Sequence, residues 1–185
     1  MQYLGLTLDP FQEKAVRAID RGESVIVAAP TGCGKTLIAD YAVDIAHGRG
    51  RRVIYTAPIK ALSNQKYRDF RERLGQDAVG IQTGDVTINP TAPLLIMTTE
   101  IFRNLLLEDS GRIEDIYYVV FDEIHYLDDP ERGTVWEESI ILAPPRIRFV
   151  CLSATVPNIE ELAQWMSAVR GSHFEVIVEH HRPVP

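Results

Sequence analysis

The residues with the clearest chemistry form one segment, Ala29-Pro30-Thr31-Gly32-Cys33-Gly34-Lys35-Thr36. An apolar run at 24–28 precedes the segment and predicts a buried strand, and the run at 37–46 that follows predicts a helix. A strand, a glycine-containing turn and a helix that starts with Lys-Thr are typical of a phosphate-binding loop. Ala29 stands where the strict pattern has glycine, but a small residue fits there.

The chemistry of this loop follows from its backbone and from two side chains. Successive N–H groups in the turn, together with the unpaired N–H groups at the start of the helix, form a site for an anion. The Lys35 ammonium brings a positive charge to the β- and γ-phosphates of a nucleotide. The Thr36 hydroxyl is an oxygen ligand of the kind that Mg²⁺ prefers. The loop therefore predicts that the chain binds ATP with Mg²⁺.

A second set of polar residues follows the apolar run at 117–121, which predicts a strand buried on both faces. Asp122 and Glu123 come directly after this run, where α/β folds bind their ligands. We expect Asp122 to hold Mg²⁺ opposite Thr36. We expect Glu123 to position and deprotonate the attacking water. Acidic pairs often cap strands, so this interpretation depends on the phosphate-binding loop that precedes the pair. His125 is either a structural histidine or a residue with a coupling role.

The elements that position these residues alternate along the chain. Strands are expected at 24–28, 53–57, 79–82, 94–98, 117–121, 147–152 and 174–178. Helices are expected at 9–21, 37–46, 59–74, 100–107, 137–142 and 159–169. Strands that alternate with helices predict an α/β fold, with a parallel β-sheet sandwiched between helices.

The composition is that of one soluble domain. The 185 residues are 45% hydrophobic and 24% charged, which are ordinary globular values. No apolar stretch approaches membrane-spanning length, and no signal peptide is visible. Cys33 and Cys151 are too few for a disulfide framework, so we expect a cytoplasmic location. A single domain is expected at 1–180, and 181–185 is interpreted as the start of a linker.

The net charge of −7 is unevenly distributed. Seven basic and two acidic residues give the segment 51–73 a net charge of +5, so the remainder carries −12. A local basic segment on an acidic body is either a phosphate-contacting face or a solvated helix face. Charge alone leaves both interpretations open.

The ordered set of motifs resembles the first RecA-like domain of superfamily-two DExH helicases. Asp122-Glu123-Ile124-His125 matches the DExH box, and Thr7-Leu8-Asp9-Pro10-Phe11-Gln12 resembles the Q motif. Within this superfamily, the chain is most similar to the superkiller-type RNA helicases, including those that feed RNA to the exosome. The segments that carry this closer resemblance lie at 56–66, 83–90, 98–101, 125–138 and 152–158.

The resemblance implies roles for residues beyond the two catalytic motifs. Gln12 would read the adenine edge through its amide, although Leu6 stands where such helicases tend to have an aromatic residue that stacks on the base. Lys35, Asp122 and Glu123 would be the catalytic residues. Contacts to the nucleic-acid backbone would come from Pro58, Lys60, Thr83, Gly84, Thr98 and Thr99, which gives the basic segment a function. Coupling of hydrolysis to strand movement would involve His125, Ser153 and Thr155.

The resemblance also implies a partner domain. Such helicases need a second RecA-like domain with arginine fingers, and no Gln-x-x-Gly-Arg-x-Gly-Arg segment occurs here. We therefore expect the motor domain of an ATP-dependent RNA helicase, with 3′-to-5′ polarity, that is nearly inactive alone. Its expected partners are single-stranded nucleic acid, with RNA favoured over DNA, and RNA-degradation machinery.

Two other functions stay open at this point. Related DExH proteins act on DNA in repair or recombination, and residues that grip the backbone do not distinguish the two nucleic acids. A non-catalytic nucleotide-binding module is the alternative from another class. Glu123 argues against such a module, because a protein that only binds nucleotide needs no general base.

Overall fold

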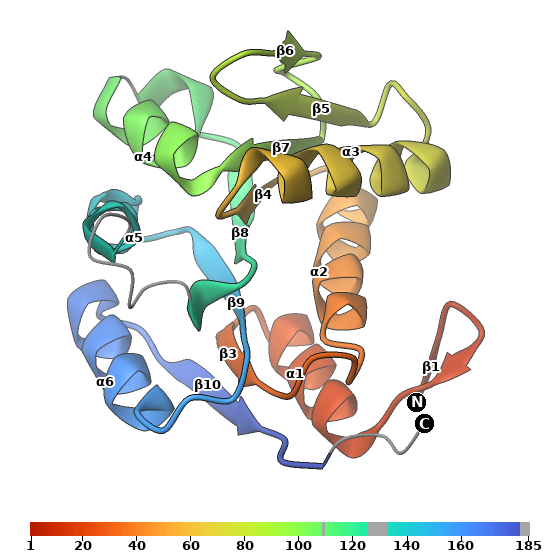
Figure 1. Cartoon of the computed structure of the whole chain (residues 1–185), viewed down its shortest axis with the longest axis vertical. Coiled ribbons are helices and arrows are strands. Elements are labelled where there is room, and N and C mark those ends of the chain that lie inside the picture. The colour runs from red at the N-terminus through yellow and green to blue at the C-terminus, as the bar shows by residue number, and fades with distance from the viewer. Residues whose placement is uncertain (109, 126–132, 182–185) are drawn as a thin grey trace.

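A parallel sheet forms the centre of the molecule (Figure 1). The computed structural model describes residues 1–108, 110–125 and 133–181. The strands of the sheet are β3 (Ser24–Ala28), β4 (Arg52–Ala57), β5 (Val79–Gln82), β6 (Thr87–Ile88), β7 (Leu94–Thr98), β8 (Ile116–Phe121), β9 (Arg148–Ser153) and β10 (Phe174–Val178). Their order is β10-β3-β9-β8-β4-β7-β5-β6, and the edge strand β6 runs antiparallel to its neighbour β5. A separate antiparallel pair, β1 (Gln2–Tyr3) and β2 (Leu6–Thr7), stands at the N-terminus.

Helices cover both faces of the sheet (Figure 1). One face carries α1 (Pro10–Asp20), α2 (Thr36–Gly48) and α3 (Lys60–Leu74). The other face carries α4 (Thr99–Glu108), α5 (Gly133–Leu142) and α6 (Ile159–Arg170), and a 3₁₀ turn lies at Ser110–Arg112. Within the described part of the chain, no helix is both long and apolar enough to cross a membrane.

The alternation of side chains along each central strand builds two separate cores. In β3, Val25 and Val27 join the core under α1, α2 and α3, whereas Ile26 and Ala28 join the core under α4, α5 and α6. Side chains on a strand point alternately to the two faces, so a strand covered on both faces must be apolar throughout. This requirement explains the continuous apolar runs in the sequence.

The α/β fold with a parallel sheet between helices is confirmed. The largest difference in an element concerns α5, which begins at Gly133 rather than at the predicted Glu137. Gly133 and the β-branched residues after it are weak helix formers, so the sequence favoured a later start. Packing supports the first turn, because the buried Trp136 ring lies against Phe121 and stacks on Trp165. The short strands β1, β2 and β6 were not predicted from the sequence.

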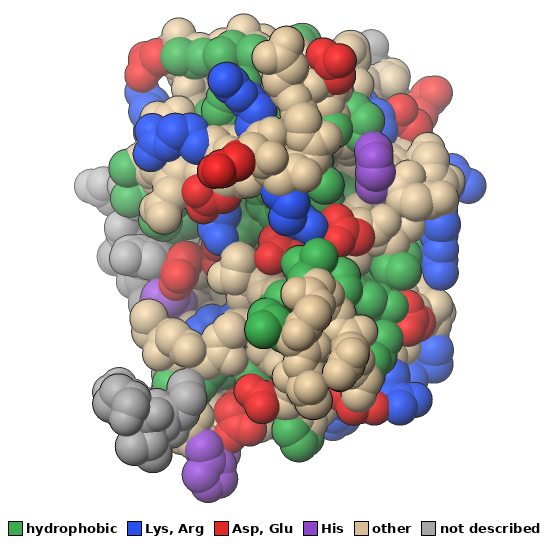
Figure 2. Space-filling view, turned by 90° about the vertical axis from the view of Figure 1, so that its right-hand side faces the viewer, with side chains coloured by type: hydrophobic (Ala, Val, Ile, Leu, Met, Phe, Trp, Pro, Cys, Tyr) green, Lys and Arg blue, Asp and Glu red, His purple; other side chains and the backbone are tan. Residues whose placement is uncertain are grey.

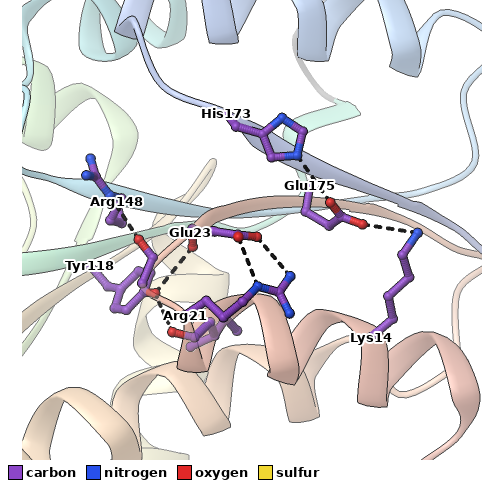
Figure 3. Close-up of polar contacts among 9 residues, drawn as sticks. Lys14, Arg21, Glu23, Tyr118, Arg148, His173 and Glu175 are labelled. Atoms are coloured by element: carbon purple, nitrogen blue, oxygen red, sulfur yellow. Dashed lines mark hydrogen bonds and ion pairs between the residues drawn. The ribbon is translucent and has the colours of Figure 1, made fainter.

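A polar network joins α1 to three strands at the amino-terminal edge of the sheet (Figure 3). The Tyr118 hydroxyl of β8 donates to the carbonyl oxygens of Ile19, at 3.1 Å, and Glu23, at 3.3 Å. Arg148 Nε of β9 donates to the Gly22 carbonyl oxygen at 3.0 Å. Arg21 donates to both Glu23 carboxylate oxygens. The turn between α1 and β3 is therefore anchored by β8 and β9.

The same edge carries an ion-pair chain on its outermost strand (Figure 3). Glu175 of β10 lies 3.2 Å from Lys14 Nζ of α1 and 3.2 Å from His173 Nε2. Hydrogen bonds from both partners hold the pKa of Glu175 below its usual range. The carboxylate therefore stays charged at neutral pH and links β10 to α1.

Candidate functional site

The phosphate-binding loop leaves β3 at the carboxyl edge of the sheet. The Ala29 N–H donates to the Ser153 carbonyl oxygen at 3.1 Å, so the loop starts in register with the end of β9. Gly32 and Gly34 have φ angles of 87° and 78°, which favour glycine. A Cβ atom at Gly34 would also lie 2.7 Å from Gln12 Nε2. The loop geometry therefore needs glycine at 34 for two independent reasons.

Gln12 joins the Q-motif segment to this loop. The side chain is buried, its Oε1 accepts from the Asp9 N–H at 2.8 Å, and its Nε2 donates to the Gly34 carbonyl oxygen at 3.0 Å. The second Nε2 hydrogen remains for a base edge. Leu6, the residue at the expected stacking position, is 57% exposed. The structure thus places Gln12 against the loop, as its predicted role requires.

Lys35 lies over the turn in a position set by the loop itself. Its Nζ donates to the carbonyl oxygens of Ala29, at 2.6 Å, and Pro30, at 3.1 Å. Partial burial lowers the pKa of the Lys35 ammonium, and the nearby charges of Glu123 and Asp122 oppose this shift. The structure therefore brings the predicted cation and the two predicted carboxylates within electrostatic range of one another.

Asp122 is held at the end of β8 by β4. Its N–H donates to the Thr56 carbonyl oxygen at 3.1 Å, and its Oδ2 accepts from the Tyr55 hydroxyl at 2.6 Å. Burial first, and then Asp122, raise the pKa of Tyr55 well above its ordinary value, so the phenol remains a donor at neutral pH. Sequence reasoning missed Tyr55, because nothing in the sequence shows that β4 and β8 are neighbours.

Glu123 and His125 form a hydrogen-bonded link between two motifs. The backbone of Glu123 is in the left-handed conformation, with a φ angle of 59°. This conformation costs a non-glycine residue about 1–3 kcal/mol. Its Oε2 lies 3.0 Å from His125 Nε2, and His125 Nδ1 accepts from the Ala154 N–H at 3.0 Å. A neutral ring that accepts at Nδ1 carries its proton on Nε2, so Nε2 donates to Glu123. The predicted base is therefore connected to the predicted coupling segment.

Ser153 and Thr155 occupy different positions in that segment. Ser153 is buried, its hydroxyl donates to the Ala154 carbonyl oxygen at 2.7 Å, and its own carbonyl oxygen binds the start of the phosphate loop. Thr155 is exposed. The segment thus contacts both the loop and the DExH box. Residues 126–132 of the motif that resembles superkiller-type helicases lie outside the described residues, as do residues 182–185 of the expected linker.

A cleft of about 660 Å³ opens beside the two carboxylates. Five of the six residues predicted to contact nucleic acid line it, namely Pro58, Lys60, Gly84, Thr98 and Thr99. Asp122 and Glu123 line the same cleft. The helices α3 and α4 begin at its wall, and helix N-termini favour phosphate groups. The cleft therefore joins the predicted nucleic-acid contacts to the two predicted catalytic carboxylates.

Thr83 is the predicted contact that does not line the cleft. The side chain is buried, and its Oγ1 accepts from the N–H groups of Asp85 and Val86 at 3.4 and 3.3 Å. Thr83 therefore shapes the turn between β5 and β6 that presents Gly84. Asp85, which the sequence reading passed over, accepts from Lys60 Nζ at 2.5 Å.

The basic segment at 51–73 does not form one basic face. Lys60 lies at the cleft, whereas Arg73, at the far end of α3, pairs with Asp40 and Asp44. Arg52 pairs with Asp115 at the amino edge. Figure 2 shows basic and acidic side chains interspersed on the face that it presents. Of the basic residues that the pairs above involve, Lys60 lines the cleft, so contact between this segment and phosphate groups stays a prediction for Lys60.

The site also fits a magnesium ion through oxygen ligands. Thr36 is exposed at the first residue of α2, and Asp122 follows β8 at the same edge of the sheet, with one carboxylate oxygen hydrogen-bonded to Tyr55. Hydroxyl and carboxylate oxygens suit a hard cation. Bound there, Mg²⁺ would neutralise charge on the β- and γ-phosphates.

Comparison with known proteins identifies the family. Residues 9–162 match the DEAD/DEAH box helicase family. The chain belongs to this family. It is 51% identical over 179 residues to the DExH-box ATP-dependent RNA helicase DExH9 of Arabidopsis thaliana, covering 97% of this chain and 18% of the relative. It is 51% identical over 178 residues to the antiviral helicase SKI2 of Saccharomyces cerevisiae, covering 96% of this chain and 14% of the relative.

A solved structure supports the same assignment of this DEAD/DEAH box domain. The Mycobacterium smegmatis helicase Lhr, bound to ssDNA and AMP-PNP, superposes with a TM-score of 0.74 at 28% identity. The match covers 94% of this chain and 26% of Lhr. The chain therefore has the fold of a helicase motor domain and spans less than a fifth of the length of DExH9 and SKI2.

Proposed function

We propose that the chain is the first motor domain of an RNA helicase, in which ATP hydrolysis drives translocation on RNA and its unwinding. The similarity to DExH9, which is named an RNA helicase, supports RNA as the substrate. The residue pattern of superkiller-type helicases supports 3′-to-5′ movement and work beside RNA-degradation machinery. Two free, buried cysteines are consistent with the reducing cytoplasm.

One observation carries this proposal, namely a hydrogen-bonded path across the carboxyl edge of the sheet. The phosphate loop is hydrogen-bonded to Ser153, and the adjacent Ala154 is hydrogen-bonded to His125. The His125 ring in turn contacts the Glu123 carboxylate. Glu123 lines the cleft that contains the predicted nucleic-acid contacts. A change at the nucleotide phosphates can therefore be transmitted to the cleft through these contacts. A motor that is driven by a nucleotide requires such a connection.

The roles of the residues follow from their positions. Gln12 and the loop at 29–36 would hold the nucleotide, with Lys35 turning from its own loop carbonyls to the phosphates. Thr36 and Asp122 would hold Mg²⁺, and Glu123 would take the proton of the attacking water. The second RecA-like domain of the parent protein would supply arginine fingers, which are worth about 10³–10⁵ in rate in P-loop enzymes.

The deciding experiment is the steady-state ATPase rate of the full-length parent protein with single-stranded RNA or with DNA of the same sequence. We expect strong stimulation by RNA and weaker stimulation by DNA. The 185-residue chain alone should turn over very slowly with either. Strong RNA-stimulated turnover by this chain alone would contradict the two-domain mechanism.

DNA is the second candidate substrate because the structurally similar Lhr is bound to ssDNA. Stimulation of the parent protein by DNA alone would favour a role in repair or recombination. A third outcome, nucleotide binding with no hydrolysis under either condition, would favour a non-catalytic module. The strained Glu123 beside the cleft argues against that outcome.

A further inference from the structure

We infer that Tyr55 is a positioning residue that orients the Asp122 carboxylate and thereby sets the affinity of the nucleotide site for Mg²⁺. The inference rests on the proposed function, because it takes Asp122 as the carboxylate that holds the metal. It adds a residue from a strand that carries none of the ATP-site motifs.

The geometry of the contact is specific. The Tyr55 hydroxyl lies 2.6 Å from Asp122 Oδ2, at the length of a strong hydrogen bond to a charged acceptor. Among the described residues, it is the only hydrogen-bond donor to this carboxylate. One carboxylate oxygen is therefore fixed by the protein, and the other is left for a ligand.

The surroundings of Tyr55 hold its ring in one place. The residue is fully buried, its ring meets Phe70 edge-on at 5.6 Å, and Lys66 Nζ lies 5.7 Å from the ring centroid. A fully buried ring that packs against α3 has little freedom to rotate. The hydroxyl therefore has a fixed position near the carboxyl end of β4. The neighbouring strand β8 leads directly into Asp122.

The expected effect on Mg²⁺ follows from this rigidity. Groups that hydrogen-bond a metal-holding side chain fix its orientation, and their loss typically weakens metal binding by about 10–100-fold. Carboxylates of this type commonly contact Mg²⁺ through water, so we expect the lower end of that range. Metal-free nucleotide does not use Asp122, and its affinity should change little.

The test is calorimetric titration of ADP into the 185-residue chain over a series of Mg²⁺ concentrations. Tyr55→Phe removes only the hydroxyl and keeps the ring contacts. We expect its apparent Mg²⁺ affinity to fall about tenfold, with less than a twofold change for ADP without metal. In an Asp122→Asn background, Tyr55→Phe should change the Mg²⁺ dependence no further.

Tyr118→Phe is the matched control, since Tyr118 is also a fully buried tyrosine whose hydroxyl is hydrogen-bonded, but at the opposite edge of the sheet. It should leave the Mg²⁺ dependence unchanged. An unchanged Mg²⁺ affinity in Tyr55→Phe, or an equal loss with and without metal, would overturn the inference. Failure of the wild-type chain to bind ADP at any Mg²⁺ concentration would instead refute the proposed function, and the inference with it.

Discussion

The two edges of the central sheet differ in how their polar groups are satisfied. At the amino edge, Tyr118, Arg148 and Glu175 bind partners within the chain and anchor α1 to three strands (Figure 3). At the carboxyl edge, Lys35 bonds the carbonyls of its own loop, and Glu123 has a left-handed backbone. One edge therefore stabilises the fold, whereas the other keeps strain and polar groups available for ligands.

The strongest test of this comparison is Glu123→Gln at the carboxyl edge. The substitution keeps size and hydrogen bonding but removes the base. ATP binding should persist, and hydrolysis by the full-length parent protein should fall by about 10²–10⁴-fold. Steady-state ATPase assays and nucleotide calorimetry measure the two effects. A normal hydrolysis rate would show that Glu123 is not the base.

The next largest effect is expected for Lys35→Ala. It removes the mobile cation of the phosphate loop, and charge-assisted contacts of this kind contribute about 1.5–3 kcal/mol. Affinity for Mg·ATP should therefore fall by about 10–100-fold in calorimetry. Urea unfolding should show no loss of stability, because partial burial already disfavours the charged ammonium and lowers its pKa. Unchanged affinity would reject the assignment of the loop.

At the amino edge, Tyr118→Phe should lower stability and leave nucleotide binding unchanged, which is the reverse of the pattern expected for Lys35→Ala. The hydroxyl serves two carbonyl oxygens in a buried position, and its loss should lower the free energy of unfolding by about 1–2 kcal/mol. Nucleotide affinity should stay the same. Urea denaturation followed by circular dichroism measures the first quantity. A variant that lost nucleotide binding without losing stability would break the division between the two edges.

The smallest expected effect concerns the cleft, where Lys60 is paired with Asp85. The pair is exposed, and exposed pairs contribute about 0.2–1 kcal/mol. Asp85→Asn frees Lys60 for a phosphate, so single-stranded RNA should bind about two- to fivefold more tightly at low salt. Fluorescence anisotropy with a labelled oligonucleotide measures the change.

Asp77→Asn provides the control for that experiment. Asp77 is also exposed and lies just before β5, at the opposite end of the strand from Asp85, so the variant makes the same change in net charge away from the cleft. It should leave RNA affinity unchanged. An equal gain in both variants would mean that overall charge, and not the Lys60 pair, limits binding.

Local sequence patterns predicted the longer strands and the phosphate loop because both depend on neighbouring residues. The glycines at 32 and 34 and the apolar run before Asp122 are such local signals. The Tyr55–Asp122 bond could not be predicted, because it depends on β4 and β8 being neighbours, and strand order is set by packing of the whole sheet. The same holds for the Lys60–Asp85 pair, which joins a helix to a distant turn.

The contact between Gln12 and Gly34 has a consequence for changing the base preference of this domain. The two residues are 22 positions apart in sequence, yet a Cβ atom at 34 would lie 2.7 Å from Nε2 of Gln12. A substitution at 34 would strain the loop whatever residue stands at 12, because the φ angle of 78° favours glycine. A library for base preference should therefore vary Gln12 and keep Gly34, whose carbonyl oxygen is the acceptor that a new side chain at 12 has to satisfy.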